Sequence, residues 1–126
     1  FVQLRQNISH WRVKKKKNLK KQIEKHGPLP AKAFPGRAAI LIKLLGLNEK
    51  YISAVYEKPG SLKIGHYVPG TKIPIFSDEK LFSLPNLSPT ILNLAWHIPK
   101  EINNYFEENK FNCSIINILD KDDFCN

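Results

Sequence analysis

The sequence has little cysteine, no long apolar run and no glycine-rich cofactor motif, and each absence excludes a class of protein. Its two cysteines, Cys113 and Cys125, both lie late in the chain. They are too few for a disulfide framework or a four-cysteine zinc site, so we expect reduced thiols. No apolar run approaches the ~20 residues that span a bilayer. Since the first residues carry charge rather than a signal-type apolar region, we expect a soluble, cytoplasmic protein.

Common catalytic and cofactor patterns are missing as well. No Gly-x-Ser-x-Gly surrounds a serine, which argues against a hydrolase with a nucleophile elbow. None of the four histidines, His10, His26, His66 and His97, has a metal-ligating neighbour at the usual spacing, so no metal site is predicted. The turn at 34–37 lacks the full G-x-G-x-x-G pattern, so the sequence does not predict a dinucleotide cofactor.

Acidic residues are scarce in one region only. Residues 1–27 contain nine Lys or Arg against the single acid Glu24, a balance of +8, whereas the rest contains eleven against ten, a balance of +1. The basic arm could bind nucleic-acid phosphates, with His10 and Trp11 stacking on bases. Alternatively it is a helix with an apolar stripe that packs on the body, interrupted where Lys15 falls on the stripe. We favour the packed helix. The stripe residues are Phe1, Leu4, Ile8, Trp11, Leu19 and Ile23.

Strand and helix patterns alternate after Gly27, which with Pro28 ends the first helix. We predict strands at 29–34, 51–56, 73–76, 90–96 and 114–119, and helices at 37–45, 78–82 and 99–109. This alternation is typical of an α/β fold, here a small Rossmann-like domain with a mostly parallel sheet flanked by helices. The expected organisation is a long basic N-terminal helix (1–27), the α/β domain (28–120) and a frayed acidic tail (121–126).

Ligands of such sheets bind beyond the carboxyl ends of the strands. The loops expected there are 34–37, 57–72 and 96–100. The 34–37 turn leads into a helix N-terminus, the position of a phosphate-binding turn. Glu57 ends the second predicted strand, where an acid often accepts from ribose hydroxyls, although a solvated carboxylate is an equal alternative.

The loop at 63–75 is the most distinctive part of the chain. Its glycines and prolines indicate a stiff, shaped loop rather than filler. It carries donors suited to a phosphate or a sugar, although an ordinary Pro-Gly turn is the alternative. These donors are Lys63, His66, Tyr67 and Thr71.

Three segments give the chain a family resemblance. They are FPGRAAIL at 34–41 followed by Gly46, the stretch from YEKPGS to KIGHYVPGTKIPI at 56–75, and LAWHIPKEI at 94–102. In order and spacing they resemble the C-terminal domain of S-adenosylmethionine-dependent sugar C-methyltransferases, over roughly residues 1–120. The chain departs from that family at Ala33 and Phe34, where a Gly-Ala pair is usual, and at Glu57, where Asp is usual.

The resemblance implies that different domains of the enzyme have different roles. Such enzymes have a zinc-binding N-terminal region, a central domain that binds S-adenosylmethionine, and a Rossmann-like C-terminal domain that closes over a nucleotide sugar. The implied partners are therefore a nucleotide-linked sugar and the other domains of the same enzyme, with the cofactor bound outside this chain, which would be inactive alone. The start at Phe1 rather than Met agrees with this expectation. The implied substrate-binding residues are Arg37, Glu57, Lys63, His66, Tyr67, Thr71, Trp96 and His97.

Two alternatives from other classes stay open on the sequence. One is a nucleic-acid-binding module that uses the basic helix. The other is a structural or dimerising domain in which the 63–75 loop contacts another subunit.

Overall fold

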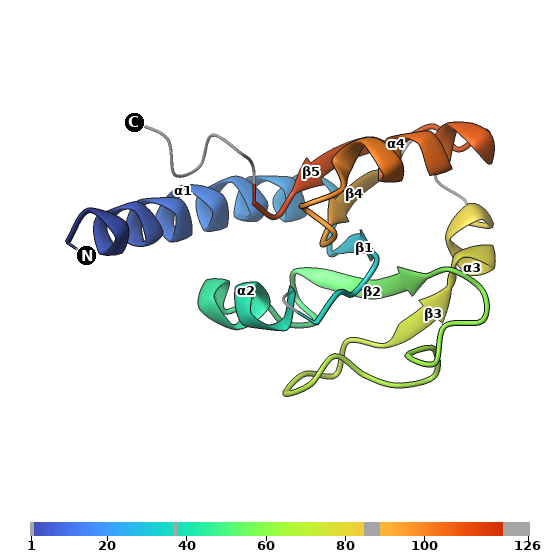
Figure 1. Cartoon of the computed structure of the whole chain (residues 1–126), viewed down its shortest axis with the longest axis horizontal. Helices are drawn as coiled ribbons and strands as arrows, with labels where there is room; N and C mark the ends of the chain where they lie inside the picture. The colour runs from blue at the N-terminus through green and yellow to red at the C-terminus, as the bar shows by residue number, and fades with distance from the viewer. Residues whose placement is uncertain (1, 37, 85–88, 120–126) are drawn as a thin grey trace.

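A computed structural model describes residues 2–36, 38–84 and 89–119, with the backbone alone for residues 2–7. Figure 1 shows how the helices and strands are arranged. In chain order they are α1 (Val2–His26), β1 (Leu29–Lys32), α2 (Ala38–Leu45), β2 (Ile52–Glu57), β3 (Ile75–Ser77), α3 (Asp78–Phe82), β4 (Thr90–Asn93), α4 (Pro99–Glu108) and β5 (Ser114–Asn117).

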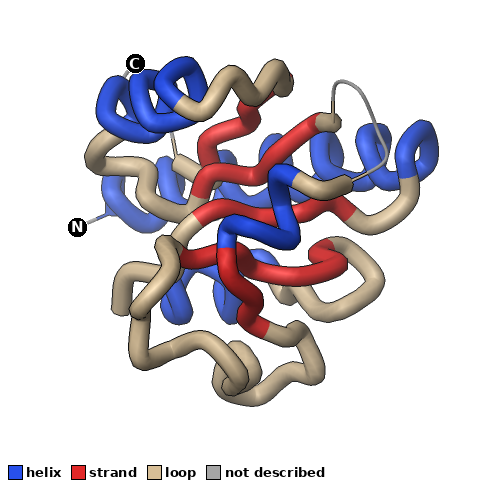
Figure 2. The backbone as a smooth tube through the Cα atoms, turned by 90° about the vertical axis from the view of Figure 1, so that its right-hand side faces the viewer, coloured by secondary structure: helices blue, strands red, loops and turns tan. Residues whose placement is uncertain are grey.

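The five strands form one parallel sheet in the order β3-β2-β1-β4-β5. The chain leaves β1 toward one edge of the sheet and leaves β4 toward the other. Because parallel crossovers are right-handed, helices that cross in opposite directions must cover opposite faces. α2 therefore lies on one face and α4 on the other, with the strands between the helix layers (Figure 2). The predicted α/β fold with a Rossmann-like parallel sheet is confirmed.

Each face of the sheet has its own apolar core. Leu29 and Ala31 of β1 point to the face covered by α1 and α2, together with Ile42 of α2. Tyr56 of β2 and Ile91 of β4 point to the face covered by α3 and α4. Burial on both faces explains why the strands are apolar runs rather than alternating ones.

The predicted strands are all present, but three of them end earlier than expected. β5 stops at Asn117 rather than at residue 119. β4 stops at Asn93 rather than at residue 96, because the Asn93 Oδ1 accepts a hydrogen bond from the Ala95 N–H at 2.9 Å and turns the chain. β1 stops at Lys32 rather than at residue 34, because Ala33 adopts φ +68. An L-residue pays about 1 kcal/mol for this left-handed conformation, which suits glycine.

The ends of the helices follow the sequence signals closely. α2 ends at Leu45, and Gly46 follows with φ +65, as its glycine predicts. The Leu47 N–H donates to the Ile42 carbonyl and the Gly46 N–H to the Lys43 carbonyl, which together form a Schellman cap. The expected helix start at residue 37 and the expected tail at 121–126 lie outside the described residues.

α1 packs on the body beside β5 (Figure 1). Trp11 and Leu19 are buried, and the Trp11 Nε1 donates to the Ile118 carbonyl at 3.1 Å. Lys15, which interrupts the apolar stripe, is only 6% exposed, and its Nζ donates to the Asn117 carbonyl at 2.9 Å. The lysine on the stripe thus satisfies a backbone carbonyl at the end of the edge strand. Although α1 is 25 residues long, no helix within the described ranges is apolar enough to cross a membrane.

A buried ion pair joins three elements on the α3 and α4 face. Lys32, the last residue of β1, is 2% exposed, and its Nζ lies 2.7 Å from the Oδ2 of Asp78, the first residue of α3. The Tyr105 hydroxyl of α4 donates to the same Oδ2 at 2.7 Å. Burial, followed by the hydrogen bond to Asp78 and its charge, raises the pKa of Tyr105 well above its ordinary value. The hydroxyl therefore stays protonated and remains a donor at any working pH.

Removing the cation of this pair should destabilise the fold strongly. Lys32→Met preserves most of the side-chain volume but leaves the Asp78 carboxylate buried without its counter-ion. Breaking a buried pair from one side costs about 3–5 kcal/mol. We expect a loss of this size in the free energy of unfolding, measured by urea denaturation.

The double variant Lys32→Met/Asp78→Leu is the matched control. It removes both charges, and replacing a buried pair by apolar side chains is often near neutral. It should therefore be more stable than Lys32→Met alone. Equal stability of the two variants would contradict the view that an unpaired carboxylate causes the loss.

Candidate functional site

The candidate site lies where the chain leaves β1 and β4 in opposite directions. These neighbouring strands end side by side, and the loop after β1 goes to α2 while the loop after β4 goes to α4. Parallel α/β sheets bind ligands at such a switch point, because the diverging loops leave room between them. We call this edge, with the loop after β2, the carboxyl rim.

The turn after β1 is fixed by two side chains from the next strand and its loop. The Glu57 Oε1 accepts from the Phe34 N–H at 3.1 Å. The Lys63 Nζ lies 3.6 Å from the same oxygen and also donates to the Phe34 carbonyl. We call this arrangement the Glu57 clasp. The clasp forms hydrogen bonds to both the N–H and the carbonyl of Phe34. It also brings together Glu57 and Lys63, two of the predicted site residues.

Trp96 and His97 lie beyond the end of β4. The Trp96 side chain is partly buried against the α1 and α2 core, and its rings meet those of His97 edge to face at 5.7 Å between centroids. The Trp96 Nε1 is buried and has no hydrogen-bond partner among the described residues. A buried unpaired donor costs roughly 1–3 kcal/mol, so an acceptor supplied by a ligand would be stabilised there. His97 is exposed beside it.

Asn93 sets the course of the loop that carries Trp96. It is fully buried at the end of β4, and besides accepting from the Ala95 N–H it donates from Nδ2 to the Asn117 Oδ1 at 2.8 Å. Our sequence interpretation treated it as one residue of an apolar strand and missed this role. The available signal was a lone amide inside a run of apolar residues.

The 63–75 loop folds back on itself next to the sheet. Tyr67 and Pro74 form an antiparallel bridge, while Val68 and Ile73 enter the core. The Thr71 Oγ1 donates to the Val68 carbonyl at 2.8 Å and accepts from the Ile73 N–H at 3.1 Å. Thr71 therefore holds the tip of this loop through its own hydrogen bonds.

The structure places the predicted site residues in separate groups. Thr71, in the loop after β2, lines a cavity with Ala39 and Ile40 of α2 and with Asn48 beyond the end of that helix. His66 and Tyr67 are exposed on the 63–75 loop. The residue at position 37 lies outside the described part of the chain. Glu57 and Lys63 form the clasp, and Trp96 and His97 follow β4.

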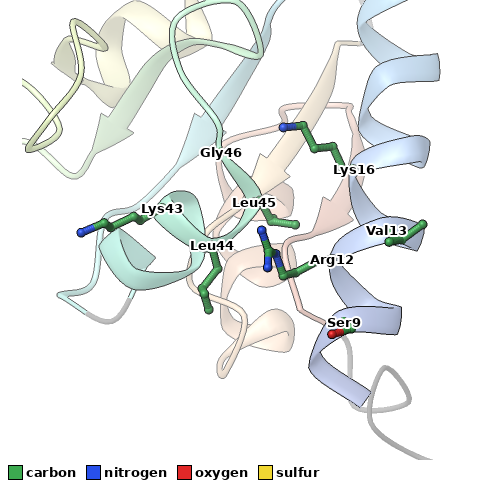
Figure 3. Close-up of a pocket in the computed structure, with 8 residues that line it drawn as sticks. All are labelled: Ser9, Arg12, Val13, Lys16, Lys43, Leu44, Leu45 and Gly46. Atoms are coloured by element: carbon green, nitrogen blue, oxygen red, sulfur yellow. The ribbon is translucent and has the colours of Figure 1, made fainter. Parts of the chain in front are cut away.

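Two cavities flank α2. The described residues that line them include neither the clasp residues nor Trp96 and His97. One, of about 430 Å³, lies between α1 and α2 (Figure 3). The other, of about 600 Å³, lies between α2 and the turn at 69–71. Within the described ranges, no group of three or more His, Cys, Asp or Glu side chains is placed to hold a metal ion.

The clasp makes a direct prediction for hydrogen exchange. In Glu57→Ala the Phe34 N–H loses its acceptor. A hydrogen bond to a charged group contributes about 1.5 kcal/mol or more, so the Phe34 amide should exchange roughly tenfold faster or more. NMR-detected exchange measures this rate.

Glu57→Gln is the matched control, since it keeps an acceptor oxygen at the same position. The Leu29 amide, which donates to the Tyr51 carbonyl at 2.8 Å, serves as an internal reference. An unchanged exchange rate of the Phe34 amide in Glu57→Ala would mean that the carboxylate oxygen does not hold Phe34.

Comparison with known sequences places this geometry in context. A family model described as "C-methyltransferase C-terminal domain" matches residues 1–112. The match runs from α1 through α4 and includes the whole rim. A comparison with characterised proteins gave no significant match.

Proposed function

The chain belongs to the C-methyltransferase C-terminal domain family, and from this premise we propose that it holds the substrate while another domain transfers the methyl group. The domain would bind the substrate at the carboxyl rim. The substrate class that we propose is a nucleotide-linked sugar, bound on the side opposite to the methyl donor. We propose the cytoplasm as the compartment, on the sequence features given above.

The buried Trp96 Nε1, which has no hydrogen-bond partner among the described residues, is the observation that carries this proposal. Trp96 follows β4, one of the two strands at the switch point of the sheet. A hydroxyl or phosphate oxygen of the substrate would satisfy the Nε1 donor, and the burial of the indole would make this hydrogen bond selective for a ligand that carries an acceptor there.

Side chains along the rim suit the two ends of a nucleotide sugar. The Lys63 side chain is 46% exposed although it also contacts Glu57, so its ammonium can still meet a diphosphate. Tyr67 is 62% exposed and offers an aromatic face to a base or a sugar ring. His97 supplies a further ring at the other side of the switch point.

The family implies that the full enzyme uses S-adenosylmethionine, but the turn after β1 does not fit this cofactor. In nucleotide-binding sheets that turn offers free backbone N–H groups to the ligand. Here the Glu57 clasp occupies both backbone groups of Phe34, and the turn lacks the glycine pattern. We therefore assign the methyl donor to another domain of the enzyme and expect the isolated chain to be inactive.

An NMR titration with a thymidine diphosphate sugar tests the proposal. The indole N–H resonance of Trp96 should shift, together with backbone resonances of residues 57–72. Trp11 is the built-in control, because its Nε1 is already bonded to the Ile118 carbonyl and should not shift. If neither Trp96 nor residues 57–72 responded, the proposal would be wrong.

The variant Trp96→Phe tests the contribution of the indole hydrogen bond separately from that of the aromatic ring. It keeps an aromatic side chain but removes the buried donor. Since a net hydrogen bond contributes about 1 kcal/mol, the affinity should fall about fivefold. An unchanged affinity would show that the indole N–H does not meet the substrate.

A further inference from the structure

An apolar surface with a basic border covers the outer side of α2 and the adjoining part of α1. Ile40 is 62% exposed and Leu44 36% exposed on α2, while Val13 on α1 is 72% exposed. Ile40 and Leu44 are one helical turn apart on α2, and Val13 and Leu44 line the same cavity. Exposed aliphatic side chains grouped in this way mark interaction sites in soluble proteins. Three cations border them. We define the α2 surface as Val13, Ile40 and Leu44 with Arg12, Lys16 and Lys43.

The α2 surface is grooved rather than flat. The cavity of about 430 Å³ separates α2 from α1, and the cavity of about 600 Å³ separates α2 from the 69–71 turn. Lys43 and Gly46 line both. α2 is thus a ridge with a groove on each side, a shape that can be filled by side chains from an opposing protein surface.

We propose that the α2 surface docks the methyltransferase domain of the same enzyme, through a patch on that domain with an apolar centre and an acidic border. This inference rests on the family membership and is independent of where the substrate binds. It names a companion domain because the family is defined as the C-terminal domain of C-methyltransferases.

Charge selects this occupant over a second copy of the chain. The described residues that line the two cavities include Arg12, Lys16 and Lys43 but no carboxylate. Two copies joined through this surface would bring like charges together, which costs affinity, whereas an acidic border is complementary. Ile40 and Leu44 argue against a polyanion such as nucleic acid, because phosphates would leave these side chains without apolar contacts.

The three cations do not have equal roles. Figure 3 shows Arg12 and Lys16 directed toward the C-terminal end of α2, where cations are favourable next to the helix dipole. The Lys16 Nζ also lies 5.5 Å from the centroid of the Tyr51 ring. Lys43 points away from α1 (Figure 3). Lys43 is therefore the cation that is best placed to meet an acidic group on the docked domain.

The position of α2 supports the choice of domain. The helix begins directly after the turn held by the Glu57 clasp. A domain docked on α2 would therefore border the carboxyl rim. Docking here gives the methyl-donor domain a fixed position next to that edge of the sheet.

Hydroxyl-radical footprinting of the 126-residue chain and of the whole enzyme tests the proposal. Side chains in the core of an interface lose contact with water, so Ile40 and Leu44 should be oxidised at least about fivefold more slowly in the enzyme. Phe111, which packs against the other face of the sheet, is the internal control and should be oxidised equally in both. Equal oxidation of Ile40 and Leu44 in the two samples would overturn the proposal.

Variants of the whole enzyme test the chemistry of the contact. Lys43→Glu should restore fast oxidation of Ile40 and Leu44, and Ile40→Asp should do the same for Leu44. Leu62→Asp is the matched control, since Leu62 is 94% exposed and lies outside the α2 surface. Because the changed side chains are exposed, the melting temperature of the isolated chain should stay within about 2 °C. Continued protection in both test variants would overturn the proposal.

Two further measurements identify a wrong occupant. A dimer of the isolated chain that Ile40→Asp abolishes would assign the surface to a second copy. Protection of Ile40 by a DNA or RNA oligonucleotide, lost at high salt, would assign it to nucleic acid. Either result overturns the proposal, and neither bears on substrate binding at the rim.

Discussion

The buried pair of Lys32 and Asp78 is the interaction on which the arrangement of this domain depends most. β1 is the central strand, and its last side chain joins the start of α3 and, through the Tyr105 hydroxyl, α4. Buried charges are tolerated only when their hydrogen-bonding capacity is met, so these elements can take few other positions. One residue later, the positive φ of Ala33 ends the strand, and Phe34 enters the Glu57 clasp. The end of β1 therefore fixes one face of the sheet and the adjoining turn together.

The carboxyl rim follows from this anchoring and from the handedness of crossovers. Because α2 and α4 cover opposite faces, the loops after β1 and β4 part at the centre of the sheet. Asn93 fixes the second loop in the way that the clasp fixes the first. With both loops held by side chains, Trp96 lies on a fixed frame. In the function that we propose, this frame favours binding because less ordering is needed.

Local patterns in the sequence were enough to predict the elements of this fold, because apolar runs, the Gly46 stop and the Asp78 helix start depend on neighbours along the chain. Contacts between side chains that are far apart in the sequence were not predictable in the same way. Lys32 and Asp78 are 46 residues apart, and no pattern among the neighbours of either residue indicates that they form a buried pair. Thr71 carries a donor suited to a ligand, but its hydroxyl donates to the Val68 carbonyl within its own loop. Sequence spacing contains no information on that bond.

α2 connects the two surfaces to which we assign a function. Its first residue is bonded through the Ala38 N–H to the Pro35 carbonyl in the turn after β1, and its exposed side forms the α2 surface. The helix is only eight residues long, so both surfaces lie within about 12 Å along its axis. A domain that docks on Ile40 and Leu44 therefore presses on the element that continues from the clasp. The clasp holds this turn with one carboxylate and one ammonium. In the function that we propose, docking and substrate holding both depend on this one short helix.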